Sequence, residues 1–116
     1  METPETKPSG RAPDSCVIAL REMLQSVLGD DFVRLYHYGS RVEGGADAES
    51  DYDVLCVTKR PLSRQQRDRV LDRQLDIQMD RHVLFDLHFR PEEQVDSTSS
   101  LYSPYLDHVI SAGVVV

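Results

Sequence analysis

Apolar residues in the first part of the chain follow a helical spacing. Val17, Leu20, Leu24 and Leu28 recur at steps of three and four residues, with charged and polar residues between them. This spacing predicts an amphipathic helix over Ser15–Leu28 with one buried face. Asp14 or Ser15 supplies the N-cap, and Gly29 ends the helix.

Three later segments have the composition of β-strands. Phe32–Tyr38 is rich in aromatic and β-branched residues, and residues 51–58 form a second apolar run closed by Pro61. In residues 83–89, Phe85, Leu87 and Phe89 alternate with Asp86 and His88. This alternation predicts a third strand with its apolar side chains on one face and Asp86 and His88 on the other.

Two further helices are predicted after the second and third strands. Residues 63–81 carry a thin apolar stripe, and we expect its members to be buried: Leu71, Leu75 and Met79. Ser103-Pro104 reads as an N-cap followed by proline, opening a helix whose buried stripe is Leu106, Val109 and Ile110. Gly113 caps this helix, and residues 114–116 can add a short edge strand.

These elements predict one small α/β (α+β) domain. We expect a mixed three- to four-stranded sheet with helices on one face and the acidic residues on the open face. With 116 residues the chain has the length of a single domain. The proline-rich residues 1–14 have no apolar core and are interpreted as a flexible N-terminal tail before a domain over residues 15–116.

Composition narrows the class of protein. No apolar run approaches the roughly 20 residues of a membrane helix, so we expect a soluble protein. Thirteen basic against twenty acidic residues give a net charge of −7, which makes duplex nucleic acid a poor partner. Cys16 and Cys56 lie in apolar segments without metal-type spacing, which favours buried thiols and a cytoplasmic location.

Three aspartates form the candidate catalytic group. Asp51 and Asp53 stand two apart on a predicted strand, so both carboxylates point to one face. Asp86 projects from the same face of the third strand and can join them if the strands are neighbours. Clustered carboxylates repel one another unless a cation lies between them, and oxygen ligands suit Mg²⁺ or Mn²⁺. Such a site fits two-metal phosphoryl transfer.

A turn before these acids has the features of a phosphate site. Gly39-Ser40 follows the first strand directly, where a glycine permits close backbone approach and a helix N-terminus attracts anions. Ser40 can donate to a phosphate oxygen and Arg41 can add positive charge. Gly39, Ser40 and Arg41 are therefore the predicted nucleotide-binding residues.

These motifs resemble a known family. Gly39-Ser40-Arg41, Gly44 and the run from Ser50 to Val54 look like the signature of the DNA polymerase β-type nucleotidyltransferase superfamily. The closing segment is similar to the end of its small members, the minimal nucleotidyltransferases. The resemblance implies a nucleotidyltransferase fold and transfer of NMP, AMP from ATP being favoured, to a hydroxyl acceptor. It implies two Mg²⁺ ions held by Asp51, Asp53 and Asp86.

The resemblance also implies a partner. Minimal members are commonly paired with a small helical protein of the HEPN class, in toxin–antitoxin pairs where a partner tyrosine receives AMP. Two other functions stay open: an inactive domain that neutralises a helical partner by contact, and transfer to a small molecule. The apolar ends of so small a domain are also consistent with homo-oligomer formation.

Some residues in the same segments have a simpler explanation. His37 and His88 are more often structural than acid/base groups when they lie within strands, and His88, on the face of Asp86, is the better candidate. The arginines between residues 64 and 73 alternate with aspartates, as on a solvated helix face. We assign them no site.

Overall fold

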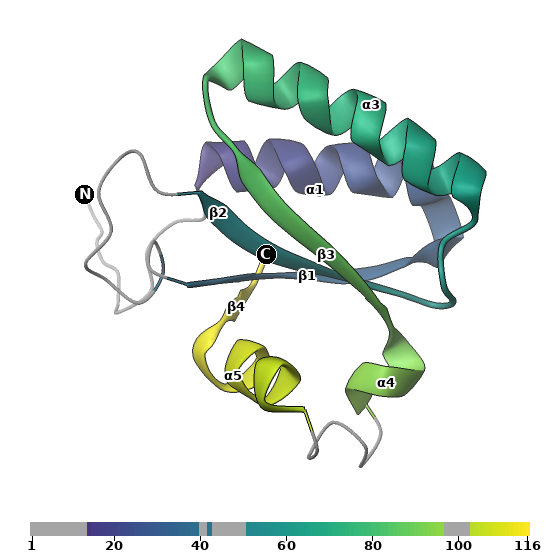
Figure 1. Ribbon diagram of the computed structural model, residues 1–116, viewed down its shortest axis with the longest axis vertical. Helices are drawn as coiled ribbons and strands as arrows, with labels where there is room; N and C mark the ends of the chain where they lie inside the picture. Colours follow the sequence, from purple (N-terminus) through teal and green to yellow (C-terminus); the bar gives the residue numbers. More distant parts are fainter. Residues whose placement is uncertain (1–13, 40–41, 43–50, 97–102) are drawn as a thin grey trace, which may run out of the picture.

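The computed structural model describes residues 14–39, 42, 51–96 and 103–116. Two helices, α1 (Ser15–Leu28) and α3 (Arg64–Arg81), lie on one side of a sheet, and two short ones, α4 (Glu92–Asp96) and α5 (Pro104–Ala112), on the other (Figure 1). The strands are β1 (Phe32–Tyr38), β2 (Tyr52–Thr58), β3 (Phe85–Pro91) and β4 (Val114–Val115). This mixed α/β architecture confirms the predicted fold class.

The first helix and strand begin and end where the sequence predicts. Asp14 is the N-cap of α1, because its side chain accepts a hydrogen bond of 2.8 Å from the backbone N–H of Cys16. Gly29 ends the helix with a φ of 55°. Asp14 also accepts a hydrogen bond from the Tyr52 hydroxyl at 2.8 Å, which ties the start of α1 to β2. Residues 1–13 of the predicted tail, which was expected over residues 1–14, lie outside the described part of the chain.

The four strands have the order β3-β2-β1-β4. β1 pairs antiparallel with β2 and with β4, whereas β2 and β3 run parallel, so the predicted short edge strand is present at the C-terminal end. β3 begins at Phe85, two residues later than predicted, and β2 begins at Tyr52. β2, the most buried strand, lies between β1 and β3.

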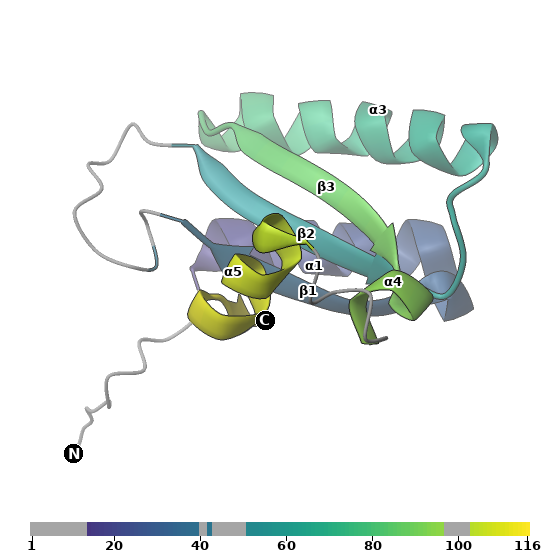
Figure 2. The same ribbon diagram turned by 60° about the horizontal axis from the view of Figure 1, so that its bottom comes forward.

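Helices cover both faces of this sheet, which corrects the prediction of one helical layer. One core holds Val54 and Cys56 of β2 against α1 and Val70 of α3. The other holds Leu55 and Val57 of β2 against α4 and α5. Figure 2 shows α5 packed against the sheet on the side away from α1. The reason is that β2 is apolar on both of its faces beyond Asp53, and each face requires cover.

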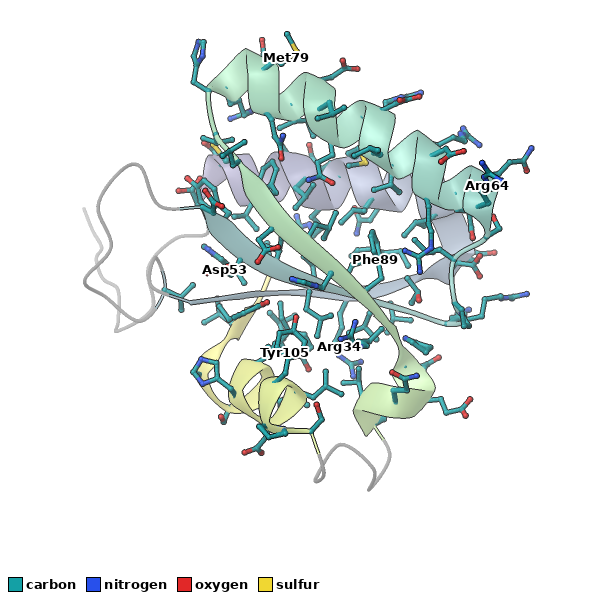
Figure 3. All side chains as sticks on the ribbon, in the orientation of Figure 1. Arg34, Asp53, Arg64, Met79, Phe89 and Tyr105 are labelled. Carbon is teal, nitrogen blue, oxygen red and sulfur yellow. The ribbon has the colours of Figure 1, made fainter. Side chains whose placement is uncertain are left out.

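The stripe predicted to be buried on α3 is exposed, so that prediction is wrong. Leu71, Leu75 and Met79 are 52%, 45% and 76% exposed, and Met79 points away from the rest of the molecule in Figure 3. The inward face instead carries Val70, at 2% exposure, and Ile77, which packs against the same core. The face of α3 that contacts α1 and the start of β3 is therefore the one with fewer apolar residues.

Two glutamines on the inward face of α3 make hydrogen bonds to the backbone at the start of β3. The backbone N–H of Phe85 donates to Gln78 Oε1 at 3.0 Å, and Gln74 Nε2 donates to the carbonyl of Phe85 at 3.2 Å. Gln74 also donates to Gln78 at 3.1 Å. These bonds satisfy polar groups at the start of β3, which leucine side chains could not do.

The last helix agrees with the prediction except at Ile110. Ser103 caps α5, with its side chain accepting from the Leu106 N–H, and Leu106 and Val109 are buried. Ile110 is 41% exposed because it lies one position past the face that contacts β1 and β2. Within the described residues, no helix has the length and apolar character to cross a bilayer.

Candidate functional site

Two of the predicted acids are direct neighbours across the sheet. Asp53 of β2 is in register with Asp86 of the parallel strand β3, and on its other side with Tyr38 of β1. Paired strands lie about 4.8 Å apart, so the two carboxylates start from adjacent backbone positions. Both project to the face on which α5 packs, because the alternate residues of β2 fill the core below α1. Like charges in such a pair repel each other.

Gly39 brings the backbone against one of these acids. It follows β1 with a φ of 87°, a left-handed conformation that favours glycine. A Cβ built on it would overlap Asp53 Oδ2 and lie 2.9 Å from Asp53 Cγ. A side chain here would require the Asp53 carboxylate to move, so the predicted turn and the predicted acid form one site. Ser40 and Arg41, the other predicted nucleotide contacts, lie outside the described residues.

Asp51, the third predicted acid, is exposed and lies one residue before β2. Within the described ranges, no three His, Cys, Asp or Glu side chains are arranged so that they could hold a metal ion. The carboxylate of Asp86 is oriented toward His88, whose Nε2 lies 3.1 Å from Asp86 Oδ1. The adjacent pair Asp53 and Asp86 offers the oxygen donors that Mg²⁺ and Mn²⁺ prefer. Participation of Asp51 stays a prediction.

The two histidines lie on opposite faces of the sheet. His37 is buried on the α1 face, where its ring contacts the ring of Tyr52 with centroids 5.6 Å apart. It is therefore remote from the face that carries Asp53 and Asp86. His88 shares that face and is half-exposed, as the alternation in the third strand predicts. His88, unlike His37, can contact a molecule bound at the acids.

An aromatic pair borders the acids on the side of β1. The hydroxyls of Tyr38 and Tyr105 lie 2.9 Å apart, and their rings meet edge to face at 5.8 Å. Burial raises the pKa of Tyr38, and the bond to Tyr105 and the charges of Asp53 and Asp86 raise it further. The Tyr38 hydroxyl therefore stays protonated at neutral pH. Tyr105 projects from α5 toward the sheet in Figure 3.

Sequence reasoning missed two residues of this face. Tyr105 contacts the ring of His88 at 5.7 Å, and the guanidinium of Arg90 lies 5.4 Å from the centre of the Tyr105 ring. The alternation that places Asp86 and His88 on one face also places Arg90 there, so Arg90 could have been found by extending the strand to its observed end. No pattern in the sequence places Tyr105 until α5 is known to cover this face.

A mixed sheet with adjacent carboxylates beside a glycine turn is an arrangement suited to phosphate chemistry at a cation. Comparison with known families agrees. Residues 19–104 match the model of the nucleotidyltransferase domain, and the chain belongs to this family. The match includes Gly39, Asp51, Asp53 and Asp86.

Curated relatives extend this result. The chain is 30% identical over 69 residues to spectinomycin 9-adenylyltransferase of Staphylococcus aureus strain Mu50, and equally to that of strain N315. The aligned part covers 60% of this chain and 26% of each relative. The chain thus spans about a quarter of the length of these adenylyltransferases.

Proposed function

We propose that the protein transfers a nucleoside monophosphate, AMP from ATP being favoured, to a hydroxyl group of an acceptor. The observation that carries this proposal is the direct pairing of Asp53 with Asp86 beside Gly39. Membership of the nucleotidyltransferase family and the similarity to adenylyltransferases support the same reaction. The protein would act in the cytoplasm.

Each residue has a role in this proposal. Asp53 and Asp86, with Asp51, are the carboxylates that would hold Mg²⁺, or Mn²⁺ in its place, as two ions. When bound, the metal supplies positive charge for the triphosphate and the leaving pyrophosphate. Gly39 leaves room for a phosphate to approach the backbone, and we assign Ser40 and Arg41 as further phosphate contacts. The Tyr38 hydroxyl, which is protonated and hydrogen-bonded to that of Tyr105, borders the site.

The proposed reaction is a direct transfer of the nucleoside monophosphate. The acceptor oxygen attacks the α-phosphorus of ATP, forming one P–O bond while the bond to the β-phosphate oxygen breaks. Pyrophosphate leaves, and the acceptor proton passes to a carboxylate of the site or to solvent. Asp86 faces solvent and is the better placed of the two paired acids to meet the acceptor. Asp53, at intermediate exposure beside Gly39, lies nearer the proposed triphosphate.

The acceptor implied by the family resemblance is a tyrosine of a HEPN-type partner in a toxin–antitoxin pair. The competing function, an inactive module that neutralises a helical partner by contact, predicts a tight complex without chemistry. A third function, transfer to a small molecule as the name of the Staphylococcus relatives states for those proteins, requires no protein partner. Observing where the label goes separates the three.

The experiment uses ATP labelled at the α-phosphate, Mg²⁺ and the protein, with and without the product of the neighbouring gene. Label on an acceptor and release of pyrophosphate support catalysis. Asp53→Asn and Asp86→Asn should each lower the transfer at least about 100-fold, a loss comparable to removing one electrostatic contact to the transition state. Asp80→Asn on the exposed side of α3 is the matched control. Transfer that survives in both site variants would refute the proposal.

A further inference from the structure

The face that carries the paired acids has a second charged end. Along β3 the side chains on this face are Asp86, His88 and Arg90, so Arg90 stands four residues from Asp86. At about 3.3 Å per residue this separation is about 13 Å along the strand. Gly39 lies at the opposite end, because it follows Tyr38, which pairs with Asp53. The acids therefore lie between the glycine turn and Arg90.

The surroundings of Arg90 leave its charge available. Arg34 on the same face is paired with Asp96, and Arg60 is paired with Asp31 at 3.2 Å. Within the described part of the chain, Arg90 has no carboxylate partner. Its Nη1 donates to the carbonyl of Phe89 at 2.8 Å, and within the described residues its other N–H groups make no hydrogen bond. A guanidinium with unused donors is suited to a carboxylate or phosphate.

Tyr105 fixes where this charge is presented. The Arg90 guanidinium lies over the Tyr105 ring, and the Tyr105 hydroxyl meets that of Tyr38 beside Asp53. The cation–π contact restrains a side chain that would otherwise sample many rotamers. A restrained guanidinium loses less conformational entropy when it binds a ligand. The ring of Tyr105 thus connects the arginine to the acid pair across one face.

We propose that Arg90 is a specificity-determining residue that binds an anionic group of the acceptor. With this group at Arg90, the acceptor hydroxyl lies at Asp53 and Asp86. This inference rests on the proposed nucleotidyl transfer and adds the charge of the acceptor to it. The triphosphate is assigned to the Gly39 end, so an anion at Arg90 belongs to the other substrate. The anion is a phosphate of a small hydroxyl compound or a carboxylate near an acceptor tyrosine.

Matched acceptors test the charge preference. Label transfer from α-labelled ATP is measured with ribose and ribose 5-phosphate, and with tripeptides Ala-Tyr-Ala and Ala-Tyr-Glu blocked at both ends. The anionic member of at least one pair should be used at least tenfold better, and the pair that shows this identifies the source of the anion. Arg90→Gln should remove the preference by raising the KM for the anionic acceptor, while the KM for ATP is unchanged. Arg90→Lys should restore part of it.

Other outcomes overturn the inference. Equal use of neutral and anionic acceptors, or a preference that survives in Arg90→Gln, contradicts it. A raised KM for ATP in Arg90→Gln would place the triphosphate at this residue. Arg64→Gln, at the exposed start of α3, is the control for a general change of charge.

A binding measurement separates this inference from the proposed activity. In protein labelled with ¹⁵N in its arginines, titration with inorganic phosphate should shift the Arg90 Nε–H resonance, which is identified by its loss in Arg90→Gln. The Arg64 resonance should shift much less. Absence of an Arg90 shift overturns the inference even if transfer is observed. A shift of the Arg90 resonance without transfer to any acceptor would support anion binding at Arg90 and contradict the proposed function.

Discussion

A Cβ atom on Gly39 would overlap the carboxylate of Asp53. The overlap involves Asp53 Oδ2, and Asp53 Cγ lies 2.9 Å from the same point. Tyr38 precedes this glycine and pairs with Asp53 in the sheet, so strand pairing itself sets the approach. The turn after β1 and the acid of β2 are consequently held in one fixed arrangement.

Gly39→Ala should therefore impair transfer. The methyl group displaces the Asp53 carboxylate, and the left-handed backbone adds a cost of about 1–2 kcal/mol to the folded state. Gly29→Ala is the matched control, because Gly29 also has a positive φ, 55°, but has nothing within 4 Å of the built Cβ. Urea unfolding measures the stability that each variant loses, and only Gly39→Ala should lose transfer activity beyond that effect. Equal activity of the two variants would show that the contact with Asp53 is not important.

The orientation of α3 is tested by two substitutions on the same helix. Val70→Ala should lower the free energy of unfolding by about 2 kcal/mol, because it leaves a cavity between α3 and α1. Leu75→Ala removes more carbon atoms but should change it by less than about 0.5 kcal/mol, since Leu75 is 45% exposed. Urea denaturation measures both. A larger loss for Leu75→Ala would mean that the predicted stripe is buried after all.

Gln78 should be required at the start of β3. Gln78→Leu keeps the size of the side chain but leaves the Phe85 N–H without its acceptor, which should cost about 1–3 kcal/mol. Gln78→Glu retains the oxygen acceptors for Phe85 and Gln74 and should cost less. Hydrogen exchange of the Phe85 amide reports the bond directly. Unchanged protection in Gln78→Leu would contradict the assigned contact.

The two cysteines should differ in reactivity. Cys56 is fully buried in β2, and burial raises the pKa of its thiol to about 12. Its thiolate is therefore scarce at pH 8. Cys16, in contrast, is partly exposed and can be reached by a reagent. A disulfide reagent such as DTNB should modify Cys16 in the folded protein and both residues in urea. Labelling of folded Cys16→Ser at a rate near that of the unfolded protein would show that Cys56 is accessible.

Local sequence patterns predicted the elements well where short-range physics determines them. Phe32–Tyr38 is bounded by glycines at 29 and 39 and is strongly aromatic and β-branched, so its ends agree with the structure. Asp86 opposite an apolar face likewise followed from alternation. These features depend on neighbours within a few residues.

Tertiary choices were less predictable. The stripe of Leu71, Leu75 and Met79 had the better helical spacing, yet α3 turns Gln74 and Gln78 inward because they satisfy the backbone of Phe85. Helices cover both faces of the sheet because β2 is apolar on both of its faces. This property can be read from the sequence of β2, but not from the spacing of apolar residues in the helices. The site residues Arg90 and Tyr105 meet only after α5 is placed on the sheet.

The central claim is that Asp53 and Asp86 together hold a divalent cation for nucleotidyl transfer. Titration of the protein with Mn²⁺ in the presence of ATP, followed by electron paramagnetic resonance, measures binding without any knowledge of the acceptor. The wild-type protein and Asp80→Asn should bind Mn²⁺ with the same affinity, whereas Asp53→Asn and Asp86→Asn should each bind at least tenfold more weakly. Equal Mn²⁺ affinity in all four proteins would contradict the account.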